Sequence, residues 1–308
     1  MTFSVRTKEE LARIEGRLCC QKAELAALVR FCGSLRAPGP EPEGLAIGTE
    51  NAGAARKAYK LLKHVCGLEA TIAIRRRQRL RKNNHYEVIV ESQPRFAEAC
   101  KALGLKARGI KKSLVGRDCC RRAYLRGAFL GRGSVSSPKG EYHLEIMAGS
   151  EPVAQDLAAL MARLGLDVRV VSRRRGWTVY IKEGTQIVDC LNLMGAHNAL
   201  LAFENARVYK EMRNRVNRLV NCDTANLSKA AEASVRHQEI IRRIDESLGL
   251  KKLPEPLRQF AELRLRYPDA SLRELGELAA PPLSKSCAGH RMRRLEAIAE
   301  RLAGKEKR

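Results

Sequence analysis

The chain has 308 residues, of which 58 are Lys or Arg and 34 are Asp or Glu, so its formal net charge is +24. This excess of positive charge favours a polyanionic partner, because each phosphate that a Lys or Arg neutralises releases condensed counterions. No apolar run approaches the ~20 residues that a membrane-spanning helix needs, and residues 1–18 lack the apolar core of a signal peptide. The composition therefore allows two or three domains, excludes a membrane partner, and predicts a cytoplasmic protein that is nucleoid-associated if it binds DNA.

After an N-terminal segment over residues 1–20, the chain contains an internal repeat. The stretch KAELAALVRFCGSL at 22–35 matches RAYLRGAFLGRGSV at 122–135, at an offset of 100 residues. Each copy is a helix-like run rich in small residues, and each ends in a glycine, Gly33 in the first copy and Gly133 in the second. The match predicts two equivalent helices.

A second pair of matched blocks follows these helices. GLEATIAIRRR at 67–77 matches GLDVRVVSRRR at 165–175, with an arginine triplet in each copy. The neighbouring elements are repeated as well. An amphipathic helix precedes each block and an alternating strand follows it, at 54–65 with 86–90 and at 153–164 with 177–181.

The two sets of matches predict an α+β fold made of tandem repeats related by a pseudo-two-fold axis. The first repeat covers residues 21–110, and the second covers residues 111–221 together with a basic connecting helix. Within one repeat we expect the order helix–strand–helix–strand–strand–helix. The antiparallel sheet of each repeat should leave one face free.

The paired helices with their closing glycines resemble those of the LAGLIDADG homing endonucleases. The resemblance implies that the residue before each closing glycine would be an acid, and that the two acids would hold the catalytic metal ions. Cys32 and Arg132 stand at those positions, before Gly33 and Gly133. A thiol is a poor ligand for magnesium, which demands oxygen ligands, and a guanidinium repels the ion. We therefore expect a nuclease-like scaffold without catalytic residues, metal or cofactor.

A metal-dependent DNA endonuclease is kept as an alternative function. Glu141 and Glu41 are acids at the same 100-residue offset, whereas the repeat mate of Asp118 is Leu18. Glu41 belongs to the predicted loop APGPEPEG and need not converge with Glu141 on a metal ion. The residues present therefore favour a binding protein over an enzyme.

Residues 222–308 predict a separate all-α domain. After the connecting helix at 203–220 we expect a loop, and then a helix over about 226–248 that Gly249 ends. Three further helices are predicted, at 256–267, 272–279 and 285–302.

The boundaries of the last two helices carry recognisable signals. Ser271 and Glu274 form a capping box at the start of the helix predicted at 272–279. Pro281 and Pro282 end this helix, because neither can donate a backbone hydrogen bond. Ser284 can cap the last helix. A short helix, a tight turn and a longer helix are typical of a helix-turn-helix module, which binds in the major groove of DNA.

The last helix has two different faces. One repeats apolar residues at helical spacing and should be buried; it consists of Ala288, Met292, Leu295, Ala299 and Leu302. The opposite face is basic near the helix start, where a recognition helix enters the groove. The residues predicted to bind DNA, within about 270–303, are Ser271, Ser284, Lys285, Ser286, Gly289, His290, Arg291, Arg293 and Arg294. Of these, Arg291 and Arg294 are expected to touch phosphates.

The ten cysteines include two adjacent pairs, Cys19–Cys20 and Cys119–Cys120, and there is no C-x-x-C motif. No pair of histidines at ligand spacing accompanies them, so a structural zinc site is not expected. The other cysteines are interpreted as small core residues of a protein in a reducing compartment.

The chain as a whole resembles the WhiA family of bacterial regulators. The stretches that carry the resemblance are AELAALVRFCGSL, RGAFLGRGSVSSP, YHLEI, ENARVYKEMRNRVNRLVNCDTANLSK and ASLRELGELAAPPLSKSCAGHRMRRL. The resemblance implies a degenerate LAGLIDADG-type domain followed by a helix-turn-helix domain. It also implies a transcription regulator that acts in cell division, chromosome segregation or sporulation, with double-stranded DNA as its partner.

Two other readings concern the basic repeat domain. It could bind RNA or the ribosome, although aromatic residues make up only 5% of the chain and Trp177 is the one tryptophan available for stacking on bases. It could instead serve as an interaction platform for other regulatory proteins.

Overall fold

The computed structural model describes residues 1–36, 43–76, 84–174 and 176–306. The chain forms two compact units, residues 1–211 and residues 212–308, and each is described by itself. A single helix, α8 (His197–Ser247), begins in the first unit and ends in the second. Among the described residues, no helix combines the length and the apolar character needed to cross a membrane.

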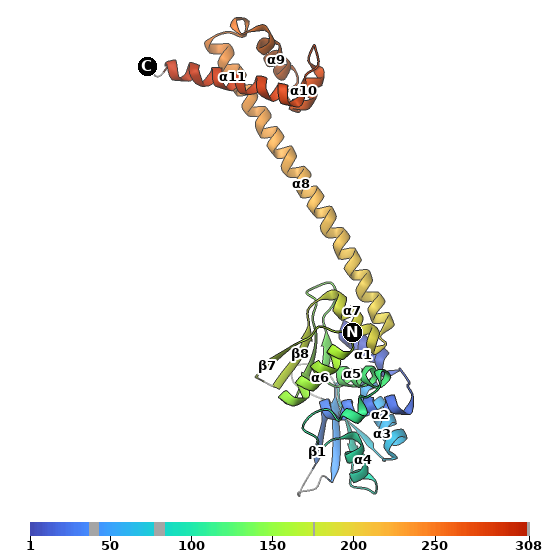
Figure 1. Ribbon diagram of the computed structural model, residues 1–308. Helices are drawn as coiled ribbons and strands as arrows, with labels where there is room; N and C mark the ends of the chain where they lie inside the picture. The colour runs from blue at the N-terminus through green and yellow to red at the C-terminus, as the bar shows by residue number, and fades with distance from the viewer. Residues whose placement is uncertain (37–42, 77–83, 175, 307–308) are drawn as a thin grey trace. The chain divides into compact units, whose positions relative to one another are not determined.

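The first unit consists of two repeats with the same order of elements (Figure 1). A short helix, α1 (Phe3–Ala12), precedes them. The first repeat contains α2 (Leu18–Cys32), β1 (Gly33–Arg36), β2 (Gly44–Thr49), α3 (Ala52–Cys66), β3 (Thr71–Arg76), β4 (Asn84–Val90) and α4 (Phe96–Leu103). After a short 3-10 turn, the second contains α5 (Asp118–Arg132), β5 (Gly133–Val135), β6 (Leu144–Ala148), α6 (Glu151–Arg163), β7 (Arg169–Arg173), β8 (Gly176–Ile181) and α7 (Gly184–Met194).

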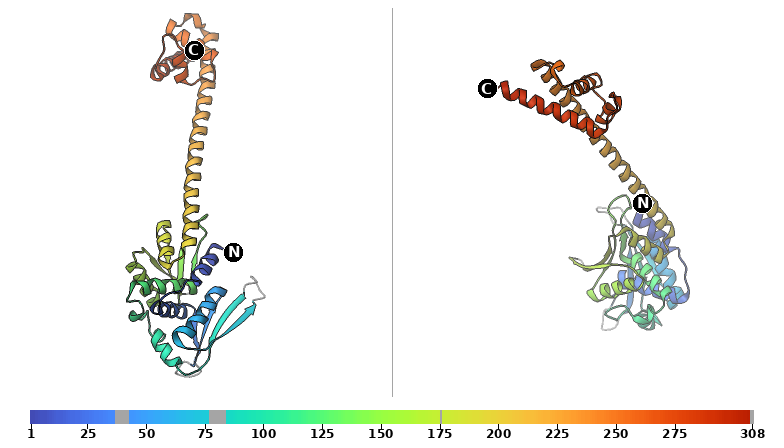
Figure 2. Two further views of the ribbon diagram at one scale, coloured as in Figure 1. Left: turned by 90° about the vertical axis from the view of Figure 1, so that its right-hand side faces the viewer. Right: turned by 45° about the horizontal axis from the view of Figure 1, so that its top comes forward.

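The two sheets have the same topology. Their strand orders are β1-β2-β4-β3 and β5-β6-β8-β7, and every pairing is antiparallel. The left view of Figure 2 shows the strands of the first sheet in blue and cyan. The expected tandem α+β architecture is therefore confirmed.

The predicted order of elements within a repeat was wrong in one respect, because two strands, not one, follow the first helix. β1 and β5 are only 4 and 3 residues long and begin at the residue directly after the helix. Strands this short show no alternation that a sequence pattern could reveal. Only glycine fits at these junctions without a clash, because a Cβ on Gly33 would lie 2.4 Å from the carbonyl oxygen of Val29.

The core of the first unit is one continuous apolar cluster to which both repeats contribute. Helices α2 and α5 pack against each other at its centre, and the small residues predicted from the repeat are buried there. The helices lie close together at Gly127, where a Cβ would lie 2.4 Å from the carbonyl oxygen of Glu24 and 2.9 Å from the Cβ of Ala27. Small side chains on these helices therefore set the distance between the repeats.

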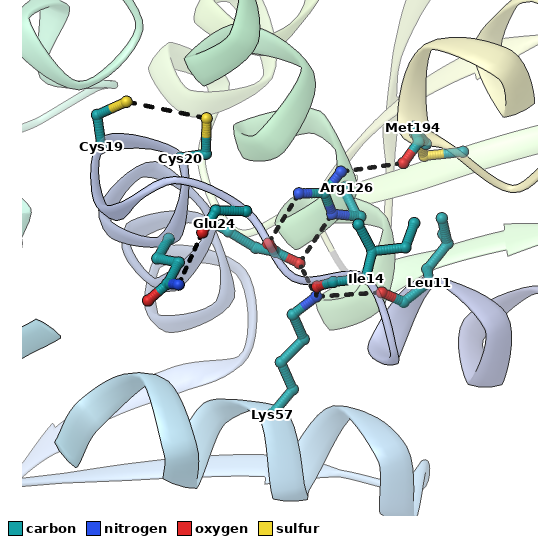
Figure 3. A network of polar contacts seen from close by, with 10 residues as sticks. Leu11, Ile14, Cys19, Cys20, Glu24, Lys57, Arg126 and Met194 are labelled. Carbon is teal, nitrogen blue, oxygen red and sulfur yellow. Dashed lines mark hydrogen bonds and ion pairs between the residues drawn. The ribbon is translucent and has the colours of Figure 1, made fainter. Parts of the chain in front are cut away.

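A buried ionic network crosses the same interface (Figure 3). The carboxylate of Glu24, 1% exposed, accepts hydrogen bonds of 3.0 Å from Nε and Nη2 of Arg126 and lies 2.7 Å from Nζ of Lys57. Lys57 also donates to the carbonyl oxygens of Leu11 and Ile14, and Arg126 donates to that of Met194. The network ties α2, α3 and α5 to the ends of α1 and α7.

The second unit contains the rest of α8, η2 (Leu250–Lys252), α9 (Glu255–Arg266), α10 (Leu272–Leu278) and α11 (Lys285–Glu306). The loop expected after residue 220 does not form, because α8 continues through it. Residues 197–247 contain neither glycine nor proline, and each polar residue such as Asn221 or Asp223 lowers helix propensity by only about 0.7 kcal/mol. The helix ends, as expected, just before Gly249, whose φ is +83°.

Candidate nucleic-acid interface

The second unit, which contains the predicted helix-turn-helix, is held together by a small apolar core. From α11 it takes Ala288, Met292 and Leu295, which are fully or almost fully buried, with Ala299 and Leu302 packed at its edge. The predicted apolar face of the last helix is therefore confirmed. The other buried members of the core are Ile241, Ile244, Leu253, Leu257, Phe260, Ala261 and Leu275.

Local hydrogen bonds fix the start of α10 and the turn between α10 and α11. The Ser271 hydroxyl accepts from the backbone N–H of Glu274, and the Glu274 carboxylate accepts from that of Ser271, so the predicted capping box is present. Ser284 caps α11 by accepting from the N–H of Cys287 at 3.2 Å. Gly276 is buried against the turn, since a Cβ there would lie 2.4 Å from the carbonyl oxygen of Leu283. The cap at Ser284 and the packing of Gly276 against Leu283 hold the start of α11 in one orientation.

A buried arginine supports the preceding turn. The side chain of Arg264, on α9, is 2% exposed and donates to the carbonyl oxygens of Pro268 at 3.3 Å and Ala270 at 2.5 Å. It thereby satisfies the backbone between α9 and α10. Sequence analysis did not identify this role, because an arginine in the last turn of a helix is usually solvated.

His237, on α8, lies beside this arginine and gives the unit a dependence on pH. Burial, together with the charges of Arg264 and Arg236, lowers the pKa of His237 from 6.5 to about 4. As pH falls between these values, the unfolded chain binds a proton that the folded unit does not. The second unit should therefore lose up to about 1.4 kcal/mol of stability per pH unit.

Hydrogen exchange of peptides from 255–302 in the full chain, measured between pH 7 and pH 4, would test this prediction. Substitution His237→Gln removes the titrating group and should flatten this dependence relative to the unsubstituted protein. An unchanged slope would contradict the prediction, because it would mean that folding does not lower the pKa of His237.

The residues predicted to bind DNA lie near the start of α11 or at the caps of α10 and α11. Seven of them are exposed: Ser271, Ser284, Lys285, Ser286, His290, Arg293 and Arg294. Arg291 is half-buried, and its Nη1 donates to the carbonyl oxygen of Pro256 at 3.2 Å. One donor of Arg291 is therefore already bonded within the unit, whereas we expected the whole guanidinium to be available for a DNA phosphate.

Gly289 is half-buried within α11, and a Cβ there would meet nothing within 4 Å. The packing of the unit itself therefore does not require a glycine at this position. Arg293 Nε lies 3.4 Å from the Gly289 carbonyl oxygen, which keeps the arginine along the exposed face of the helix.

The two positions that would hold metal ions in a LAGLIDADG nuclease carry a thiol and a guanidinium. Cys32 ends α2 and Arg132 ends α5, directly before Gly33 and Gly133. Burial raises the pKa of the Cys32 thiol to about 12, and the thiol donates to the carbonyl oxygen of Leu28 at 3.0 Å. Burial lowers the pKa of Lys8, which interacts with Cys32, to about 8. A neutral thiol between cations offers no carboxylate to a magnesium ion.

The acids considered for a metal site do not add ligands to this position. The side chain of Glu141 is exposed on the loop between β5 and β6, and Asp118 forms an ion pair of 2.6 Å with Arg121 in the first turn of α5. Glu41 lies outside the described residues.

The free faces of the two sheets carry several arginines. On the first sheet, Arg36 and Arg75 lie 3.6 Å and 3.3 Å from the carboxylate of Glu87. On the second, Arg169 and Arg173 occupy alternate positions of β7 and are exposed, so they share one face. Arg77 and Arg175, the last residues of the predicted triplets, lie outside the described residues.

The adjacent cysteine pairs, at which no metal site was expected, come together in the structure. Cys19 and Cys20 meet Cys119 and Cys120, and all four sulfur atoms lie within 4.8 Å of one another. Each pair alone lacks the spacing of a metal site. The signal that could have found the cluster was the 100-residue offset of the repeat, which makes the two pairs equivalent residues on two helices that pack together.

Comparison with known proteins covers both units. Residues 18–106 match the family described as "WhiA N-terminal LAGLIDADG-like domain", residues 121–213 the "WhiA LAGLIDADG-like domain", and residues 216–299 the "WhiA C-terminal HTH domain". A "Probable cell division protein WhiA" from Desulforudis audaxviator is 58% identical over 98% of each chain. Another, from Desulforamulus reducens, is 54% identical over 99% of this chain and 98% of its own.

Solved structures agree with these matches. Full-length DUF199/WhiA from Thermatoga maritima aligns with 98% of this chain and 99% of its own, with a TM-score of 0.61 and 26% identity. The N-terminal LAGLIDADG domain of DUF199/WhiA covers 63% of this chain and 90% of its own, with a TM-score of 0.52 and 20% identity, and so shows the fold alone. With tandem LAGLIDADG-like repeats followed by a helix-turn-helix unit, and with relatives more than half identical over nearly its full length, this chain belongs to the WhiA family.

Proposed function

We propose that the protein is a sequence-specific DNA-binding transcription regulator, in which α11 reads the major groove. The observation that carries the proposal is the exposed basic surface at the start of this helix. Lys285, His290 and Arg293 are exposed there, while the opposite face of the helix forms the core. A helix held rigidly by caps and core on one side, with basic side chains on the other, suits docking into a groove.

The residues of this surface have different proposed roles. Arg293 is suited to donate to a guanine edge, while Lys285, Arg294 and the Ser286 hydroxyl are suited to contact phosphates. Gly289 leaves the open space of the helix surface available to the DNA backbone. Arg291 is proposed to hold α11 against α9 while its remaining donors reach a phosphate.

The repeat unit is proposed to bind polyanions or regulatory proteins without cleaving DNA. Its charge supports this assignment, because residues 1–211 carry a net charge of +16. The thiol of Cys32 and the guanidinium of Arg132 replace the acids that magnesium-dependent cleavage would require. The names of the relatives support a role in the regulation of cell division. We extend the proposal to the regulation of chromosome segregation or sporulation by a protein bound to the nucleoid.

Substitution Arg293→Ala tests base readout. Genomic fragments retained by the protein would first define a target duplex, and binding would then be measured on that duplex and on a scrambled one. We expect a loss of about 1–3 kcal/mol on the target and a much smaller loss on the scrambled duplex, because a bidentate contact to guanine discriminates between bases.

Arg301→Ala is the matched control, since Arg301 is an exposed arginine in the C-terminal half of the same helix. Its removal should reduce target affinity far less than removal of Arg293. Equal losses on both duplexes would make Arg293 a phosphate contact. Retention of RNA in place of DNA, unaffected by either substitution, would contradict the proposal and favour RNA binding.

A further inference from the structure

Four cysteines gather where the first turns of α2 and α5 meet. Cys19 and Cys20 come from the first repeat, and Cys119 and Cys120 from the second. The two sulfur atoms within each pair are 3.9 Å apart, and all four sulfur atoms lie within 4.8 Å of one another. Cys20 and Cys120 are buried, whereas their neighbours are half-buried.

These distances are close to those of a single tetrahedral metal site. Zinc bound by four thiolates has Zn–S bonds of about 2.3 Å, which place the sulfur atoms about 3.8 Å apart. The 3.9 Å within each pair already meets this value, and the remaining pairs need to shorten by 1 Å or less. The side chains therefore need only small movements to close around an ion.

The chemistry of the four ligands selects the kind of ion. Thiolates bind soft and borderline metal ions such as zinc, whereas magnesium and calcium require oxygen ligands. Binding of one Zn²⁺ by four thiols releases four protons and leaves a tetrathiolate centre with a net charge of −2. The cysteines occupy the first turns of two helices, where the helix dipoles favour negative charge.

We propose that Cys19, Cys20, Cys119 and Cys120 form a structural zinc site that joins the two repeats. Each repeat supplies two ligands, so neither repeat can complete the site alone. All four positions are filled by protein, as in structural rather than catalytic zinc sites. The site lies at the N-terminal ends of α2 and α5, whereas Cys32 and Arg132 lie at the opposite ends of the same helices.

The full-length protein, purified under reducing conditions without chelators from zinc-supplemented cells, provides the first test. Metal analysis should find about one zinc ion per chain, and X-ray absorption at the zinc edge should show only sulfur neighbours, at about 2.3 Å. Replacement of zinc by cobalt should produce the thiolate-to-cobalt charge-transfer band and the visible absorption of a tetrahedral site. These measurements need no variant and are independent of DNA binding.

Variants identify the ligands. The double substitution Cys19→Ser and Cys119→Ser should abolish stoichiometric zinc binding, whereas Cys222→Ser with Cys287→Ser, which changes two exposed cysteines, should leave it intact. The proposal is overturned if the unsubstituted protein holds no more zinc than the Cys19→Ser, Cys119→Ser variant, or holds only copper. It is also overturned if cysteines trapped in intact cells are linked by disulfides across the repeats.

Discussion

Substitution Glu24→Ala is expected to lower the free energy of unfolding of the first unit by about 3–5 kcal/mol. The carboxylate lies between two buried cations, with Nζ of Lys57 at 2.7 Å and the Arg126 guanidinium at 3.0 Å. Without Glu24, these cations would remain in a buried site and repel each other, and their backbone acceptors could compensate only in part. Denaturant unfolding followed by Trp177 fluorescence would measure the loss, because this single tryptophan lies on β8 in the first unit.

Two further variants test whether the instability of Glu24→Ala comes from buried uncompensated charges or from the loss of one ion pair. Glu69→Gln is the matched control, since Glu69 pairs with Lys63 at 3.8 Å but is 77% exposed, and its loss should cost less than about 1 kcal/mol. The triple variant Glu24→Leu, Lys57→Met, Arg126→Met should be more stable than Glu24→Ala, because no uncompensated charge remains buried. If Glu24→Ala were as stable as the unsubstituted protein, water would have to reach the charges of Lys57 and Arg126.

Substitution Gly127→Val should cost about 3 kcal/mol through overpacking between α2 and α5. The added Cβ would lie 2.4 Å from the backbone carbonyl of Glu24, which a side-chain movement cannot relieve, so the two helices would have to separate. The same fluorescence-monitored unfolding measures the effect.

The matched control for this substitution is Gly116→Val. A Cβ on Gly116 meets nothing within 4 Å, and the residue does not have a positive φ. We expect a change of less than about 0.5 kcal/mol, as for most surface substitutions. Comparable destabilisation by both variants would indicate that the loss reflects a property of glycine and not the distance between the repeats.

The repeat could be predicted from sequence because the duplicated segments still match at a nearly constant offset of about 100 residues. The matched stretches at 22–35 and 122–135 indicated the two helices, and periodicity placed the amphipathic helices and the alternating strands. The short strands β1 and β5 escaped because so few residues show no alternation. The loop expected near residue 221 was wrong because local propensity is a weak prior when no glycine or proline stops a helix.

The candidate site was predictable to the extent that it depends on one helix. The apolar face of α11 and the exposure of Arg293 follow from helical spacing, and its cap follows from the serine, Ser284, directly before the helix. Contacts between distant elements could not be found in this way. Glu24 acquires its partners only when separate helices pack together. Arg264 reaches the carbonyl oxygens of the turn after its own helix, a contact that helical spacing does not show. The four cysteines could have been brought together only from the 100-residue offset of the repeat, not from the spacing within either pair.

The shared core of the first unit also affects how the protein is made. Leu25 and Leu28 of α2 are buried in one cluster with Leu125 and Phe129 of α5, which the ribosome adds 100 residues later. At roughly 5–20 residues per second, α2 emerges on the order of 5–20 s before its partner helix. During that interval the face of α2 that packs against α5 stays uncovered, while α3 and α4 of the same repeat can already pack against its other faces. We therefore expect chaperones at the ribosome exit to bind the nascent chain.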